Sequence, residues 1–218
     1  MSETLLNLEE ALKKVVELSL EKKRKFTESV DIAVKLGIDA KQSDQMVKSS
    51  LVLPNGSGKK VRVLVFTGND GAAKEANDAG AELVGLEELI TKIDGGFLGF
   101  DCCIATPDAM PKIGKIARKL GPRGLMPSPK NGTVTNDVAK AVADALKGRV
   151  DFRNDKAGIV HCLIGKADFK FEDLLANLKA VVKSIKDAKP ESSKGKYIRD
   201  FYINSTMGQA VKVDVASV

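Results

Sequence analysis

The chain has 218 residues, 43% hydrophobic and 29% charged, a composition that excludes wholesale disorder and fits one large domain or two small ones. Its 35 Lys and Arg residues exceed its 29 Asp and Glu residues, which gives a net charge of +6. This balance favours an anionic partner, with nucleic acid ahead of an acidic membrane surface. The longest apolar runs fall far below the roughly 20 residues of a membrane span, so we expect none.

The N-terminal third predicts one helix and two strands. Asn7 can cap a helix whose apolar stripe includes Leu8, Leu12 and Val15, and a basic run follows at residues 22–25. Strict alternation over residues 30–36 is typical of a half-buried strand, and residues 48–53 form a second strand candidate.

The pattern changes after the turn-forming cluster at residues 54–58. Nearly continuous apolar runs then alternate with amphipathic segments, which is typical of a small parallel sheet covered by helices. The expected strands are 61–66, 82–84 and 101–105, and the expected helices are 72–79, 86–93, 111–120 and 136–147.

A second change of pattern comes at Gly148. Short strands are expected at 149–153 and 158–164, then a long amphipathic helix at 171–188, and final strands at 198–203 and 211–215. We therefore predict an α+β domain built from both termini, residues 1–57 and 148–218. An α/β domain, residues 58–147, is inserted into it through a double hinge at Gly56, Gly58 and Gly148.

The chain offers little for catalysis or metal binding. Its single histidine, His161, lies in an apolar strand, and its three cysteines lack metal-ligand spacing. The turn at residues 68–71 lacks the G-x-G-x-x-G fingerprint of a dinucleotide-binding enzyme, the alternative that the middle domain suggests. We predict no enzyme, no cofactor and no metal. The cysteines, in apolar runs, are expected to be buried reduced thiols of a cytoplasmic protein.

Residues 109–136 contain six cations and no acid, so this segment alone carries a charge equal to that of the whole chain. A stiff loop rich in Pro and Gly lies inside it, at residues 121–133. The loop and its cations suit a surface that faces phosphates, although acids elsewhere in the fold are an alternative partner. The candidate residues of this basic loop are Arg118, Lys119, Arg123 and Lys130.

Three other segments have features of nucleic-acid contacts. Phe26 follows the basic run and can stack on a base, although it can equally be a core residue of the next strand. Residues 153–156 offer donors on a turn. The polar turn at residues 204–208 can read an RNA minor groove, or is a simple hairpin turn.

Taken together, these motifs resemble the ribosomal protein L1 family over nearly the whole chain, in order and with matching spacing. The segments that carry the resemblance are 25–30 (KFTESV), 36–39 (LGID), 52–56 (VLPNG), 105–108 (ATPD), 121–130 (GPRGLMPSPK), 152–158 (FRNDKAG) and 205–208 (STMG).

The resemblance implies a non-enzymatic, two-domain protein of the large ribosomal subunit, in which the inserted α/β domain is Rossmann-like. Its discontinuous domain would bind large-subunit rRNA and form the mobile stalk beside the exit site, where it assists release of deacylated tRNA. Bacterial members also repress translation by binding their own operon mRNA. We expect a monomer outside the ribosome, and an extra-ribosomal regulatory RNA-binding protein is the alternative. The implied rRNA contacts are Lys25, Phe26, Glu28, Ser29, Arg153, Asp155, Lys156, His161, Ser205, Thr206, Met207 and Gly208.

Charge and resemblance therefore point to different surfaces. Charge alone favours the basic loop at 121–132, whereas the resemblance favours the other domain. The basic loop would then face the interdomain cleft or exit-site tRNA.

Overall fold

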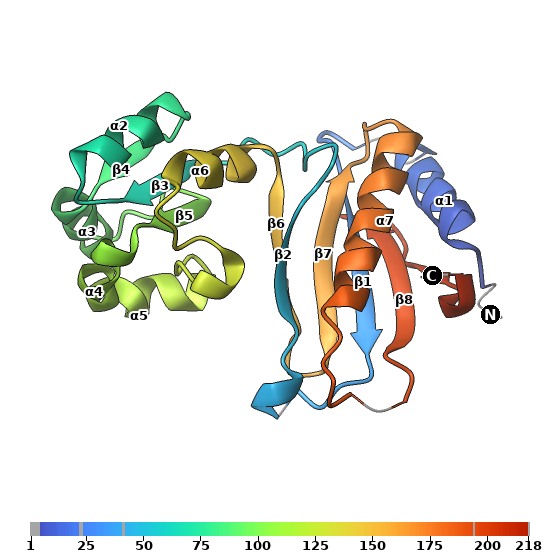
Figure 1. The fold of residues 1–218 in the computed structure, drawn as a ribbon. Coiled ribbons are helices and arrows are strands. Elements are labelled where there is room, and N and C mark those ends of the chain that lie inside the picture. Colours follow the sequence, from blue (N-terminus) through green and yellow to red (C-terminus); the bar gives the residue numbers. More distant parts are fainter. Residues whose placement is uncertain (1–4, 22–23, 41, 194, 218) are drawn as a thin grey trace. The chain divides into compact units, whose positions relative to one another are not determined.

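The computed structural model describes residues 5–21, 24–40, 42–193 and 195–217 (Figure 1). The chain is mixed α/β and divides into two compact units. The first unit comprises Met1–Gly58 and Arg149–Val218, and the second comprises Lys59–Gly148.

A four-stranded antiparallel sheet, in the order β7-β1-β8-β9, forms the centre of the first unit. Its strands are β1 (Ser29–Leu36), β7 (Ile159–Lys166), β8 (Ile198–Ser205) and β9 (Val211–Val213). Two further strands, β2 (Lys48–Val52) and β6 (Arg149–Arg153), pair as an antiparallel ribbon. A single-turn 3-10 helix at Ser43–Gln45 precedes β2.

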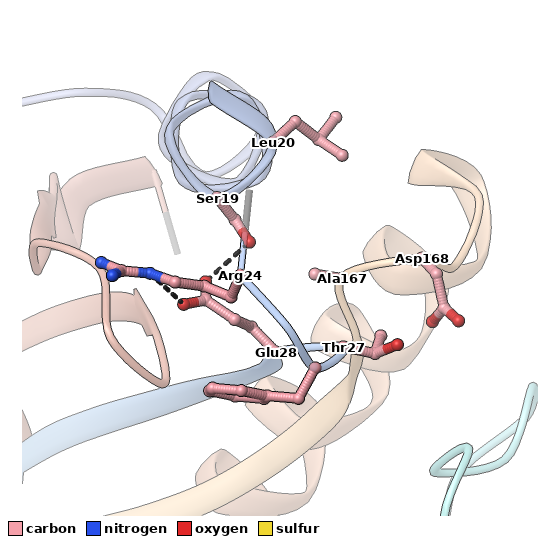
Figure 2. Close-up of a pocket in the computed structure, with 8 residues that line it drawn as sticks. Ser19, Leu20, Arg24, Thr27, Glu28, Ala167 and Asp168 are labelled. Atoms are coloured by element: carbon pink, nitrogen blue, oxygen red, sulfur yellow. Dashed lines mark hydrogen bonds and ion pairs between the residues drawn. The ribbon is translucent and has the colours of Figure 1, made fainter. Parts of the chain in front are cut away.

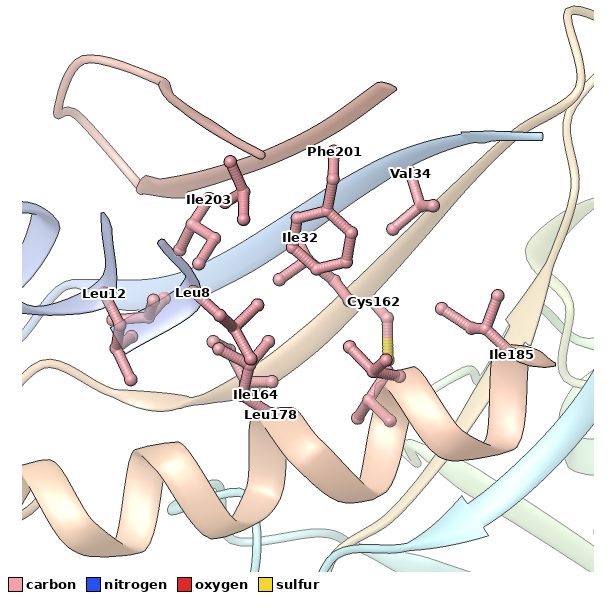
Figure 3. Packing of buried hydrophobic residues seen from close by; sticks show 14 of the residues in the cluster. Leu8, Leu12, Ile32, Val34, Cys162, Ile164, Leu178, Ile185, Phe201 and Ile203 are labelled. Carbon is pink, nitrogen blue, oxygen red and sulfur yellow. The ribbon is translucent and has the colours of Figure 1, made fainter. Parts of the chain in front are cut away.

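Helices α1 (Leu8–Glu21) and α7 (Phe171–Asp187) pack on one face of this sheet (Figure 1). Their apolar stripes meet the buried residues of the strands, as Figure 3 shows for Leu12 on α1, Leu178 on α7 and Ile32 on β1. Burying these side chains drives this packing. The alternation predicted for β1 is confirmed, because Val30 and every second residue after it are buried.

The residues between them, Ser29, Asp31, Ala33 and Lys35, are half-buried or exposed on the opposite face. His161 on β7 pairs with Ala33 and is exposed. The sheet therefore keeps one polar face, which β1 and β7 share.

The second unit is built on a parallel sheet in which β3 (Val63–Phe66) lies between β4 (Leu83–Gly85) and β5 (Cys102–Ala105). All four residues of β3 are buried, because helices cover both faces. The longer helices are α2 (Asp70–Asp78), α3 (Glu87–Asp94) and α6 (Val138–Leu146).

Two predicted elements differ in the structure. The helix expected at 111–120 is divided into α4 (Met110–Ile113), a 3-10 turn at Gly114–Ile116 and α5 (Ala117–Leu120). Gly114 is a poor helix former, and its turn has 3-10 geometry. The strand expected at 211–215 ends at Val213, because the Asp214 carboxylate accepts a hydrogen bond from Ala216 N (3.0 Å) and starts a 3-10 turn at Val215–Ser217.

Cys103 and Cys162 are buried, as predicted, whereas Cys102 is only half-buried. Burial, with a smaller contribution from the Asp31 charge, raises the pKa of Cys162 to about 12, so its thiol stays protonated at neutral pH. Within the described residues, no helix combines the length and the apolar character needed to cross a membrane.

Candidate nucleic-acid interface

Glu28 lies at the centre of the candidate interface, just before β1, with only 4% of its surface exposed. Ser19 Oγ on α1 donates a hydrogen bond to Glu28 Oε2 (2.7 Å), and Arg24 Nε lies 3.6 Å from Oε1 (Figure 2). The Ser19 hydrogen bond lowers the pKa of Glu28, against the opposing effect of burial. Glu28 is therefore a buried carboxylate that is held in its charged form.

The turn after β8 lies directly beside Glu28. Val30 pairs with Ser205, which places Thr206 against Ser29. Thr206 Oγ1 accepts a hydrogen bond from Ser29 N (2.9 Å), and Thr206 N donates to Ser29 O (3.0 Å). The Ser205 hydroxyl and the Met207 backbone N–H also favour the charged form of Glu28. Two segments about 180 residues apart thus share one hydrogen-bonded unit.

Two apolar side chains project from this unit. Phe26 is 53% exposed and Met207 is 60% exposed. Phe26 precedes β1 and is outside the core, so the alternative in which it is a core residue of the strand is wrong. Large exposed apolar groups beside a polar, hydrogen-bonded surface are typical of interaction sites. Lys25 is exposed beside Phe26 and adds a cation.

Gly208 closes the turn by donating from its N–H to Ser205 O (3.1 Å). A Cβ atom at this position would lie 2.2 Å from Ser205 Oγ, so any larger residue would force the buried Ser205 hydroxyl to move. The turn therefore favours glycine here.

The second predicted turn joins β6 to β7 and is held by its own side chains. Asp155 Oδ1 accepts hydrogen bonds from Ala157 N and Ile159 N, both at 2.8 Å. Asn154 Oδ1 accepts from Val47 N (2.8 Å), which fixes the turn to the segment before β2. Asp155 thus shapes the turn, while Arg153 and Lys156 are exposed on it.

The structure does not gather all the predicted contacts in one place. β7 runs antiparallel to β1, with Ser29 opposite Lys166 and Lys35 opposite Ile159. The turn at 154–158 therefore lies at the opposite end of the sheet from Thr206, roughly 20 Å away at about 3.3 Å per strand residue. His161 lies between them on the polar face. Any ligand that contacts both turns must extend along that face.

In the second unit, acids on α3 neutralise part of the basic segment. Lys112 Nζ lies 2.8 Å from Glu87 Oε1, and Lys119 pairs with Asp94. Arg118 and Arg123 are exposed, and no ion pair is found for either within the described ranges. The side chain of Lys130 lies outside what the structure describes.

A cavity of about 430 Å³ lies beside Gly68 and Thr106, which follow β3 and β5. In Rossmann-like folds this edge binds nucleotides. Here Asn69 Oδ1 accepts a hydrogen bond from Gly71 N (2.9 Å), which occupies a donor at the start of α2. Asp108 adds a negative charge to the lining, and the cation of Lys112, which also lines the cavity, is paired with Glu87.

The three predicted hinge glycines all have positive φ angles: 71° at Gly56, 70° at Gly58 and 102° at Gly148. Only glycine adopts this region readily. Gly56 O accepts a hydrogen bond from Asn177 Nδ2 (3.0 Å), and a Cβ on Gly58 would lie 2.9 Å from the Phe169 ring. Gly56 and Gly58 are therefore held against the first unit.

The comparisons with known proteins agree with these motifs. The sequence model of the ribosomal protein L1p/L10e family matches residues 13–209. The chain belongs to this family. It is 52% identical over 214 residues to "Large ribosomal subunit protein uL1" of Nitrosomonas europaea, covering 98% of this chain and 91% of that one.

Other L1 relatives show similar values. The protein of the same name from Dechloromonas aromatica is 49% identical over 218 residues, covering 100% of this chain and 93% of its own. That from Legionella pneumophila strain Corby is 52% identical over 195 residues, covering 89% and 84%. The match to the L1 family includes both turns and the basic loop.

Several residues of the site in this L1-family chain are absent from the sequence prediction. Ser19 and Arg24 hold Glu28, while Leu20 and Asp168 line a cavity beside it. Leu20 falls eight residues after Leu12, a spacing that would group it with the apolar stripe, so periodicity did not predict its exposure. The proximity of Asp168 was not predictable either, because it depends on the pairing of β7 with β1.

Proposed function

We propose that this protein is a structural component of the large ribosomal subunit in the cytoplasm, and that its first unit binds large-subunit rRNA. The relatives' shared name supports the first part. The observation that carries the second is the exposure of Phe26 and Met207 beside the buried, ion-paired Glu28. No catalytic role is proposed, because the family is one of structural ribosomal proteins.

In this proposal the protein recognises the shape of a folded RNA. The Ser29–Thr206 hydrogen bonds fix the turn before binding, so little conformational entropy is lost on contact. Phe26 and Met207 contact sugars or bases, and the exposed polar groups of the turn reach 2′-hydroxyl groups. Lys25 and Lys156 contact phosphates, which makes the affinity depend on salt.

The two ends of the sheet would then contact different parts of one RNA. Arg153 and Lys156 lie at one end and Thr206 at the other, with His161 on the face between them. Because Asp155 is engaged within its turn, it would act by presenting Arg153 and Lys156.

We further propose the finer roles of the L1 family for this chain. It would form the mobile stalk beside the exit site and assist release of deacylated tRNA, with Arg118 and Arg123 as the exposed cations that meet tRNA phosphates. It would also repress translation by binding its own operon mRNA, and it would be a monomer outside the ribosome. Hinge motion would begin beyond Gly58, since Asn177 holds the preceding residues.

Binding to a large-subunit rRNA stalk fragment and to a scrambled RNA, each at two salt concentrations, tests the main proposal. Selective binding that survives moderate salt supports it. Equal, salt-sensitive binding to both RNAs would leave only a basic protein. Co-sedimentation with large subunits separates the ribosomal role from that of a free regulatory RNA-binding protein.

A further inference from the structure

A cavity of about 210 Å³ adjoins Glu28 in the first unit (Figure 2). Leu20 at the end of α1, Phe26 before β1 and Ala167 after β7 form its apolar walls. Cavities of about 150 Å³ hold a benzene ring in other proteins, so this one has room for a flat aromatic group.

The walls are unusual for a protein surface. Leu20 is 61% exposed and Phe26 is 53% exposed, and both line the same cavity. A flat ring that entered would cover both side chains and stack on an aromatic surface. Stacking of a base on an aromatic side chain is worth about 1–3 kcal/mol in single-stranded nucleic-acid complexes.

The polar groups of the cavity divide into engaged and available ones. Ser19, Arg24 and Glu28 interact with one another. Thr27 and Asp168 are exposed at the rim. Ala167 N donates a hydrogen bond to Glu28 O (2.9 Å), which fixes the backbone from which the Asp168 side chain projects. An occupant therefore meets an exposed carboxylate that can only accept hydrogen bonds.

We propose that this cavity takes an unpaired guanine of the bound RNA, with Asp168 accepting hydrogen bonds from its N1–H and exocyclic N2–H groups. This inference rests on the rRNA binding proposed above. Guanine presents two adjacent donors on its Watson–Crick edge. Adenine and cytosine present one, and uracil flanks its single donor with two carbonyl oxygens that repel a carboxylate. Unpaired bases of folded RNA are the ones that proteins extract and read in this way.

The first test compares Asp168→Asn with Asp187→Asn, a matched control at the exposed end of α7. Both changes remove one negative charge, which by itself strengthens RNA binding. The proposal expects the opposite at Asp168: binding to the rRNA stalk fragment weakens by about tenfold, as for loss of one bidentate base contact. Leu20→Ala is expected to weaken binding severalfold. Unchanged or tighter binding by Asp168→Asn would overturn the proposal.

The second test identifies the base. Each unpaired guanine of the fragment is replaced in turn by inosine, which lacks the 2-amino group. One position is expected to weaken wild-type binding about tenfold and to have little further effect on Asp168→Asn, because both changes remove the same contact. If no position behaves in this way, guanine recognition by Asp168 is wrong.

A third measurement separates this inference from the proposed function. If the wild-type chain does not bind the fragment at all, the proposed function fails, and the cavity is then probed directly with millimolar GMP. Selective NMR shifts of the Leu20 and Thr27 methyl groups with GMP, but not with AMP, CMP or UMP, would support the guanine site. Equal shifts or none would overturn it.

Discussion

Thr206 Oγ1 lies 2.9 Å from Ser29 N and 3.3 Å from Ser29 O, so one side chain ties the turn after β8 to the start of β1. The same turn bears the exposed Met207 and approaches Glu28 through its backbone. Thr206 therefore has a structural role within the free protein: it fixes the shape of the turn before any RNA binds.

Thr206→Val is expected to weaken specific rRNA binding by roughly 1–3 kcal/mol, because valine keeps the shape of the side chain but cannot hydrogen-bond to Ser29. Thr206→Ser should keep most of the affinity. Filter binding to the stalk fragment and to a scrambled RNA measures both. An equal loss on the two RNAs would show that the turn carries no selectivity.

Met207→Ala is expected to lower specific binding by about 1–3 kcal/mol while leaving thermal stability nearly unchanged. The side chain is 60% exposed, so the free protein gains little from it. Calorimetric melting and RNA titration of the same preparation separate the two effects. A large fall in melting temperature would instead assign Met207 a role in folding.

Asn177→Ala is expected to destabilise the first unit by about 3 kcal/mol. Asn177 is fully buried on α7, where it accepts a hydrogen bond from Asn55 N and donates to Gly56 O and Ile164 O. Its removal leaves these backbone groups unsatisfied. Urea unfolding measures the change, with Lys179→Ala on the exposed side of α7 as a control expected within about 0.5 kcal/mol of wild type.

Asp101 should make the second unit sensitive to acid. The hydrogen bond from Lys59, helped by Arg62, lowers the pKa of Asp101 from 3.8 to about 2 against the effect of burial. A lowered folded-state pKa gives stability that is present above pH 3.8 and is lost as the pH falls toward 2. The free energy of unfolding of the wild type should therefore exceed that of Asp101→Asn by about 1–2 kcal/mol at pH 7. This range is smaller than the pKa shift alone implies, because the partner cations are exposed and screened by solvent.

Thermal melting of the wild type and of Asp101→Asn at pH 7 and near pH 2 measures this difference in stability. It should shrink at the lower pH, because the folded-state carboxyl is about half protonated at its pKa of about 2 while the unfolded-state one is almost fully protonated. A difference that stays constant would show that Asp101 acts through packing and not through its charge.

The double variant Arg118→Ala/Arg123→Ala is expected to weaken tRNA binding. The number of counterions released on binding, obtained from the salt dependence of the affinity, should fall by about two. Lys112→Ala/Lys119→Ala is the matched control, because Glu87 and Asp94 already pair with those lysines. Affinity for tRNA across a series of salt concentrations distinguishes the pairs. Equal effects would mean that the ion pairs with Glu87 and Asp94 do not keep these lysines from contacting tRNA.

The periodicity of the sequence correctly predicted the buried face of β1 and the apolar stripe of α7. It could not predict the break at Gly114, because the tendency of one glycine to interrupt a helix depends on the packing around it. It also left Phe26 undecided between the core and the surface. The exposure of the Phe26 side chain, which lies before β1 and outside the core, decided that question.

By itself, the sequence determined the mixed α/β character, the basic charge and the L1-family motifs, since periodicity, composition and short motifs are local properties. Only the tertiary structure decided which distant groups meet. The strand register joined Thr206 to Ser29 and moved the turn at 154–158 to the far end of the sheet, while helix packing placed acids of α3 beside Lys112 and Lys119. Such pairings depend on how buried faces fit together across the chain, which no local pattern specifies.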